Sequence, residues 1–517
     1  MTEEQELVDF VLEQTTMPLD RWAVAATLES GGVRDIDAVE RFGRRDVFDL
    51  ADHIYALCQA AGRAGAGEPA PDPAPRRELL VRYLRGGFFF LQLALQLGSL
   101  AVLGYGQWAS LDFSGRQASI VGIALITSFL FSGPAGQVIG FLGPFFAESG
   151  KHLLAARAAA VGVLLGLGTL LAGGVLLGGL NIVLGGYDNR SLGVGLVYYA
   201  LAGVVSLTGA LLYMLKQFSA MAAATVLGIA TVGLVLHRTD LGIYGAHWIG
   251  LGVSILVEGL WASIIFQRRI AATSAELRTA IAPTWAHLAR LVSPYALYGL
   301  GYFALLFVDR PAAWSAGVHQ LPFQFRATYE VGLDWALISV VPGLAMLEVT
   351  LYALSRRIVA LGERYDATSV AEHNAQLISF YRRHLSYVML LLLLGGATTF
   401  GALLAASHYH WTKVSDLFTA PTTLHVYLLG LAGYVLLVSA LFNGLFLFSV
   451  GRPWLVVRAL APAIVVAIVL AFTLSRLVVY WASAGGLVAG AGVFALLSAH
   501  SARRILRSID FYYFAAY

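Results

Sequence analysis

The sequence predicts an all-α polytopic membrane protein of about twelve transmembrane helices in two six-helix bundles, preceded by a small helical domain. Of the 517 residues, 58% are hydrophobic and only 13% are charged, and the mean hydropathy is +0.72. Soluble domains carry about 25% charged residues. Apolar stretches long enough to cross the ~30 Å hydrocarbon core of a bilayer recur along most of the chain. The 55 glycines suit membrane helices, where small residues allow close packing.

Residues 1–61 predict a separate acidic helical domain in the cytoplasm. Its apolar side chains recur at helical spacing, namely Leu7, Phe10, Val11, Val24, Ala25, Leu28, Val47, Leu50, Ile54 and Leu57. Asp20 and Asp46 stand before two of these stretches and are expected to cap helices. Cys58 is the only cysteine, so we expect a small buried side chain rather than a disulfide. The acidic N-terminus lacks the basic start and apolar run of a cleavable signal peptide.

The rest of the chain is expected to form a linker, two bundles and a tail. Residues 62–85 are predicted to be a Gly/Pro linker with a basic lead-in. Spans are expected at 86–109, 117–143, 156–180, 193–215, 218–237, 241–266, 291–309, 331–355, 386–406, 423–449, 454–476 and 479–499. A polar interval after six spans, 271–290, is expected to be a cytoplasmic linker between a first bundle, 86–270, and a second, 291–500. Residues 501–517 then form a cytoplasmic tail.

The distribution of basic residues predicts the orientation of the protein. With the N-terminus inside, the outer ends of the spans hold only Arg116, Arg190, Arg238, Arg310, Arg326, Lys413 and Arg476, and most other Lys and Arg lie near inner ends. Cytoplasmic loops of membrane proteins carry such an excess of positive charge. We therefore expect a multi-pass protein of the bacterial inner (cytoplasmic) membrane, with the N- and C-termini in the cytoplasm.

Signatures of enzymes are absent from the sequence. It contains no P-loop, no GxGxxG that opens a helix after a strand, and no GxSxG elbow. The first expected outer loop holds one acid, Asp112, and the larger outer loops hold no carboxylate pair or metal-ligand spacing. We therefore expect no enzymatic activity, cofactor or metal, and no nucleic-acid partner.

Two acidic residues lie inside expected spans. Glu258 lies in VSILVEGLWASIIF and Glu348 in VPGLAMLEVTLYAL. An ionised carboxylate that faces lipid costs several kcal/mol, so each should face a cavity or a partner, or be protonated. One interpretation is an acid that faces the substrate or couples transport to protons. The alternative is a structural acid near the cytoplasmic interface, paired with Arg268 or Arg356.

Three further acids lie at the outer ends of expected spans. Asp309 ends the seventh span, and Glu330 and Asp334 open the eighth. We expect them to line the outer mouth of a transport path, although ordinary interfacial charges would occupy the same positions.

Two prolines lie within spans beside a glycine. Pro134 follows Gly133, and Pro342 precedes Gly343. A mid-span proline removes a backbone hydrogen bond and kinks the helix, as occurs where helices line a cavity. The alternative at both positions is a static kink. His247, in the sixth span, is expected to make a hydrogen bond between helices rather than to bind metal.

Several motifs occur in a recognisable order. The stretch 128–157 contains Gly133-Pro134, then Glu148 and Lys151. Tyr329-Glu330 leads into Ile338-Ser339-Val340-Val341-Pro342. A basic inner loop, 356–383, and an aromatic tail, 509–514, follow. In this order and spacing, residues 86–517 resemble the family of inner-membrane exporters of the Pel exopolysaccharide system, within the multidrug/oligosaccharidyl-lipid/polysaccharide (MOP) flippase superfamily. The sequence lacks the basic residue that this family shows within Gly143–Glu148, and residues 1–75 have no counterpart.

The resemblance implies two six-helix bundles that face each other as a V, as in MATE-type flippases. It implies alternating-access export of a polysaccharide or lipid-linked saccharide. The implied partners are membrane and cytoplasmic subunits of a polysaccharide synthase complex, including a glycosyltransferase. An acidic path through Glu258, Glu348, Glu330 and Asp334 would suit a partly cationic amino-sugar polymer. Two alternatives remain open: a small-molecule or drug antiporter of the same superfamily, and a non-transporting membrane scaffold whose residues 1–61 recruit a synthase.

Overall fold

The computed structural model describes residues 3–15, 18, 20–65, 76–273, 284–317, 321–364, 370–410, 413, 415–418 and 420–507. Parts of the expected linkers 62–85 and 271–290 and of the tail 501–517, including the aromatic stretch 509–514, lie outside these ranges. Every regular element within the described ranges is a helix. This confirms the predicted all-α class.

The chain divides into two compact units. One joins Met1–Leu80, Val349–His384 and Arg503–Tyr517, and the other joins Val81–Glu348 and Leu385–Ala502. The first unit holds the N-terminal helices. The second holds most of the apolar helices and all of the acids predicted to be functional.

The N-terminal helices are α1 (Glu3–Thr15), α2 (Arg21–Ser30), α3 (Asp35–Glu40) and α4 (Val47–Gly65). Both predicted caps are present. The Asp20 carboxylate accepts a hydrogen bond from the Ala23 backbone N–H at 2.8 Å, and the Asp46 carboxylate accepts one from the Asp49 N–H at 2.8 Å. Such caps satisfy N–H groups that have no partner within the helix.

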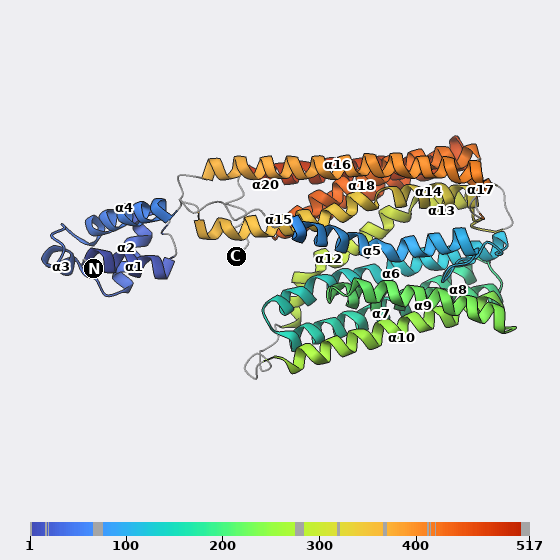
Figure 1. Ribbon diagram of the computed structural model, residues 1–517, viewed down its shortest axis with the longest axis horizontal. Coiled ribbons are helices and arrows are strands. Elements are labelled where there is room, and N and C mark those ends of the chain that lie inside the picture. Colours follow the sequence, from blue (N-terminus) through green and yellow to red (C-terminus); the bar gives the residue numbers. More distant parts are fainter. Residues whose placement is uncertain are drawn as a thin grey trace. The chain divides into compact units, whose positions relative to one another are not determined.

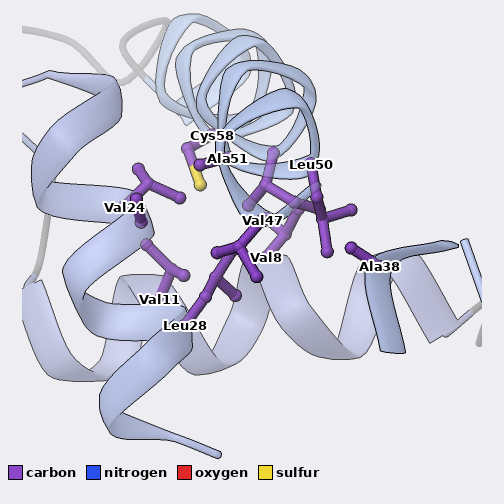
Figure 2. Packing of buried hydrophobic residues seen from close by; sticks show 11 residues of the cluster. Val8, Val11, Val24, Leu28, Ala38, Val47, Leu50, Ala51 and Cys58 are labelled. Atoms are coloured by element: carbon purple, nitrogen blue, oxygen red, sulfur yellow. The ribbon is translucent and has the colours of Figure 1, made fainter. Parts of the chain in front are cut away.

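These helices enclose a hydrophobic core of their own. Buried side chains from α1, α2, α3 and α4 pack together, among them Val11, Leu28, Ala38 and Leu50 (Figure 2). Cys58 is fully buried in the same cluster, as expected. Burial disfavours the thiolate and raises the pKa of the Cys58 thiol to about 11.

The buried thiol predicts how the N-terminal helices respond to pH and alkylation. In the full-length protein, N-ethylmaleimide should label Cys58 slowly at pH 8 and quickly once urea unfolds these helices. The thiol's pKa is higher folded (about 11) than in the reference state (9.0), so its stabilising contribution is present below pH 9 and is lost between pH 9 and 11. The loss amounts to at most about 1.4 kcal/mol per pH unit. The urea midpoint of labelling should therefore fall over that range.

A matched control for this labelling is a variant that combines Cys58→Ala with Glu6→Cys. Glu6 is exposed on α1, so its thiol should be labelled quickly without urea. Fast labelling of Cys58 in native protein at pH 8 would contradict the buried position.

The remaining helices form the membrane part. In chain order they are α5 (Arg76–Leu103), α6 (Gly115–Glu148), α7 (His152–Leu184), α8 (Asn189–Met214), α9 (Phe218–Arg238), α10 (Gly242–Ala271), α12 (Trp285–Phe307), α13 (Asp309–Trp314), α14 (Ala327–Ser339), α15 (Val341–Arg364), α16 (Val370–Tyr409), α17 (Ser415–Phe418), α18 (Pro421–Ser449), α19 (Pro453–Leu477), the 3₁₀ helix η2 (Tyr480–Ser483) and α20 (Ala484–Leu506). Eleven segments of the described chain are long and apolar enough to cross a membrane. The number rises to 12 if the two parts of α5, which meet at a bend of 50°, count together as one span. The predicted number of about twelve is confirmed.

We call α5 to α10 the first half of the membrane part and α12 to α20 the second half. Helices α6 to α10 pack against one another (Figure 1), and in the second half α14 packs on α18 and α12 on α19. Helix α6 of the first half also contacts α12 of the second. We call the ends with turns 104–114, 185–188 and 239–241 the distal face, and the ends with turns 149–151, 215–217 and 450–452 the proximal face.

The two prolines occupy different positions in their helices. Pro134 lies inside α6, which continues to Glu148. Pro342 is the second residue of α15, directly after the break between α14 and α15 at Val340. A proline at the start of a helix loses little, because the N–H it lacks would have no partner there. The span Ala327–Leu354 is therefore two helices joined at its middle.

Candidate transport path

Glu348 lies between the two halves. A Cβ built on Gly86 of α5 would stand 3.1 Å from the Glu348 Cβ, so α5 passes directly beside this residue. The carboxyl group also interacts electrostatically with the Tyr213 hydroxyl of α8. Glu348 is partly exposed, and its carboxyl group has no hydrogen-bond partner among the described residues. The side chain of Arg356, its alternative partner, lies outside the described part.

Tyr213 of α8 lies near Glu348, on the side of the first half that faces the second. It interacts electrostatically with both Glu348 and Tyr298 of α12. The residue as a whole keeps 43% of its surface accessible. Tyr213 is near the last residue of α8, so this meeting point of the halves lies toward the proximal face.

Glu258 lies within the first half and is fully buried. Its Oε2 accepts a hydrogen bond from the Thr208 hydroxyl of α8 at 2.5 Å. Its Oε1 has no partner in the described part of the chain. Its hydrogen-bond partner is thus a hydroxyl rather than Arg268. A carboxyl group in such surroundings needs a nearby cation or a proton.

Other polar groups follow the same face of α10. His247 Nδ1 and the Tyr198 hydroxyl are 2.8 Å apart, which confirms the predicted hydrogen bond between helices. One face of a helix presents residues three, four and seven apart, and Ser254 and Glu258 follow His247 at those spacings. The Ser254 hydroxyl accepts a hydrogen bond from the side-chain amide of Gln107 and donates one to the Ala224 carbonyl at 2.8 Å. A row of buried polar groups therefore runs along α10.

The acids at the end of the seventh span and the start of the eighth form a buried cluster around Arg310. Asp309 is fully buried, and Arg310 and Glu330 nearly so. Arg310 Nε lies 3.0 Å from Glu330 Oε2, and Arg310 Nη1 lies 3.5 Å from Asp309 Oδ1. The Tyr329 hydroxyl donates to Asp309 at 2.6 Å. These residues tie α13 to α14.

Aromatic and hydroxyl groups complete the cluster. Trp314 Nε1 donates to Glu330 Oε1 at 2.9 Å, and Arg310 donates to the Tyr434 hydroxyl of α18 at 3.3 Å. Ser483 of η2 donates to the Tyr329 hydroxyl at 2.9 Å. The central position of Arg310 was not predicted from the sequence, and Tyr434 was not predicted at all. The adjacent Asp309-Arg310 pair in an apolar stretch was the available signal.

Asp334 differs from the other two acids of this region. It follows Glu330 by four residues and so lies on the same face of α14. Both Glu330 oxygens are engaged, by Arg310 and Trp314. Asp334 is partly exposed, and its carboxyl group has no hydrogen-bond partner within the described residues. Asp334 is thus the acid of this group that can accept a new partner.

The halves are joined at the distal face. The Phe325 N–H donates to the Ser119 hydroxyl at 2.8 Å, and Lys413 Nζ donates to the Leu103 carbonyl at 2.8 Å. The Tyr187 hydroxyl donates to the Phe323 carbonyl at 3.4 Å. Each bond links the first half to the second.

Helices α6 and α12 cross at a pair of glycines. A Cβ built on Gly299 would lie 2.6 Å from the Gly133 carbonyl oxygen. The crossing is flanked by the stacked rings of Phe129 and Phe303, 5.9 Å apart, and of Phe141 and Tyr295, 3.9 Å apart. The halves therefore meet backbone to backbone at the middle of these helices, directly beside Pro134.

Comparison with solved structures identifies the fold. A MOP superfamily transporter from Pyrococcus furiosus superposes with a TM-score of 0.60 and 16% sequence identity, covering 83% of this chain and 96% of the other. The membrane part has the MATE transporter fold. A MATE protein in its straight conformation matches with a TM-score of 0.58, 15% identity and coverage of 84% and 96%. An outward-facing multidrug resistance MATE transporter matches with a TM-score of 0.57, 16% identity and coverage of 84% and 96%.

The MATE fold agrees with the fold that the resemblance noted in the sequence implies. No protein-family profile and no curated protein sequence matches this chain. At 15–16% identity these structures show the fold alone. Within the MATE fold of this chain, Glu258 belongs to the first half, Asp309, Glu330 and Asp334 to the second, and Glu348 to the space between them.

Proposed function

We propose that this protein is a Pel-like exporter or flippase that moves a polysaccharide, or its lipid-linked precursor, across the bacterial inner membrane by alternating access. One observation carries the proposal: an acid without a hydrogen-bond partner among the described residues, Glu348, lies between the halves of a MATE fold, beside α5 and Tyr213 of α8. A carboxyl group in a membrane-spanning segment is retained at a cost, so it marks a substrate or ion path.

The direction of transport follows from the two faces. The halves are hydrogen-bonded to each other at the distal face, and the partly exposed Tyr213 lies between them toward the proximal face. With cytoplasmic termini, the proximal face is the cytoplasmic one, and substrate enters there. Export then requires that the proximal side close and that bonds such as Phe325 to Ser119 break. A substrate drives this change only by the difference in its affinity for the two states.

The acids have separate roles in this proposal. Glu348 contacts the substrate between the two halves. Glu258, buried beside Thr208, exchanges a proton when the first half rearranges. Asp334 provides the next acidic contact toward the distal face. Cytoplasmic and membrane subunits of a synthase complex, including a glycosyltransferase, deliver the polymer to the proximal face.

Replacing both in-span acids tests this assignment. The Glu258→Gln/Glu348→Gln double variant should secrete about 10- to 100-fold less polymer, because each charge-assisted contact is worth about 1.5–3 kcal/mol. Secreted polymer is measured in producing cells, and the membrane protein level is measured by immunoblot. Asp240→Asn, at an exposed acid in a distal turn, is the matched control and should export normally. Normal export by the double variant at a normal protein level would contradict the role of these acids.

A second candidate is a small-molecule antiporter. The observation in its favour is that the matching structures include a multidrug resistance MATE transporter. Purified protein in proteoliposomes distinguishes the two, because an antiporter should exchange a cationic dye for protons without any synthase subunit. A non-transporting scaffold should move neither dye nor saccharide in the same vesicles.

A further inference from the structure

The N-terminal helices expose a pair of aromatic rings. Trp22 at the start of α2 is 57% exposed, and Phe48 at the start of α4 is 48% exposed. Their ring centroids are 5.3 Å apart in an edge-to-face arrangement. The core of these helices is complete without them, because Val24 and Leu28 of α2 and Leu50 and Ile54 of α4 fill it. Exposed apolar surface of this kind marks an interaction site.

Small side chains continue the same face along both helices. Helices α2 and α4 pack against each other. Ala26 follows Trp22 by one turn, and Ala56 follows Phe48 by two turns, and both are exposed. We call the surface formed by Trp22, Ala26, Phe48, Asp52 and Ala56 the α2–α4 face. Bulky rings at one end and alanines beyond them leave room for another helix to lie on it.

Helix α3 also carries exposed apolar side chains. The Asp35 carboxylate accepts a hydrogen bond from the Val47 N–H at 2.9 Å, which places the start of α3 beside the start of α4. Ile36 and Val39, three residues apart on one side of α3, are 54% and 51% exposed.

The charge of the surroundings selects the kind of partner. Asp52 is itself part of the α2–α4 face, and Asp20 and Glu29 lie at the two ends of α2. The Asp52 carboxylate lies 3.4 Å from the exposed guanidinium of Arg21. In total, residues 1–61 hold 13 acidic residues and five arginines. Anionic lipid and nucleic acid are repelled by such a surface. A cationic protein segment is attracted to it.

We propose that the α2–α4 face docks a basic amphipathic helix of a partner protein. The apolar side of that helix packs on Trp22 and Phe48, and its Lys and Arg residues face Glu29 and Asp52. This function goes beyond transport and does not depend on which substrate the membrane part carries. If the membrane part is an exporter, docking holds the partner protein on the exporter's own N-terminal helices.

Site-specific photo-cross-linking in cells tests the proposal on the full-length protein. p-Benzoylphenylalanine replaces Ala26 at the centre of the face, and mass spectrometry identifies the cross-linked peptide. The expected product joins the p-benzoylphenylalanine at position 26 to a partner segment that has apolar residues at helical spacing and Lys or Arg on its other side. The same probe at Glu6, exposed on α1, should give no such product.

Two variants make the test specific. Trp22→Ala/Phe48→Ala should lower the cross-linking yield by about thirtyfold or more, as for central aromatic residues of an interface. Glu29→Gln/Asp52→Asn should lower it less and make it less sensitive to salt. Slow labelling of Cys58 shows that each variant is still folded. The proposal is overturned by cross-links only to lipid, to a second copy of this chain or to a segment without basic residues. It is equally overturned by no cross-link, or by a yield unchanged in Trp22→Ala/Phe48→Ala.

Discussion

Arg310→Ala is expected to lower the free energy of unfolding of the membrane part by about 3–5 kcal/mol. This is the usual cost of removing one partner from a buried ion pair. Arg310 lies between Glu330 and Asp309, and all three are buried. Without the guanidinium, two carboxylates would remain together with no positive charge beside them among the described residues. Thermal unfolding of the purified protein in detergent measures the loss.

An exposed ion pair provides the control for this substitution. Arg116, the second residue of α6, pairs with Asp188 of the distal turn 185–188, and the two side chains are 50% and 53% exposed. Exposed pairs contribute about 0–1 kcal/mol, so Arg116→Ala should change stability little. Arg310→Lys keeps the charge but not the several directed donors, and it should fall between wild type and Arg310→Ala. Equal effects of Arg310→Ala and Arg116→Ala would contradict the buried network.

Gly299→Val is expected to abolish transport and to destabilise the protein by about 1–3 kcal/mol, the usual range for overpacking. Even a Cβ at this position would lie 2.6 Å from the Gly133 carbonyl oxygen, so backbone has to move. The added side chain forces α6 and α12 apart at the point where the two halves meet. Export in producing cells and thermal unfolding are measured together.

A second glycine separates this effect from helix propensity. Gly252 lies inside α10, and a Cβ built there would meet nothing within 4 Å. Gly252→Val places the same β-branched side chain in a helix, so it carries the same propensity term without the steric conflict. Normal export by Gly252→Val and lost export by Gly299→Val are expected. If the two variants export equally well, the crossing is not the tight contact described here.

Features that depend on local sequence were predictable. Hydropathy decides which segments can cross a bilayer, so the number of spans could be counted from the hydropathy along the sequence alone. The caps at Asp20 and Asp46 depend on residues three positions away, and both were anticipated. The burial of Cys58 and the hydrogen bond of His247 followed from the cost of leaving these side chains in the wrong environment.

Pairings between helices were decided only by the tertiary structure. Thr208 and Glu258 are fifty residues apart, and Arg310 meets Tyr434 across 124 residues. Glu348 lies beside Tyr213 of the other half, and Gly299 meets Gly133. Hydropathy does not determine how a helix is rotated about its axis or how far it is shifted along that axis relative to a neighbouring helix. Those two quantities are set by packing along whole helices, and they determine which acid is buried, which is paired and which lies between the halves.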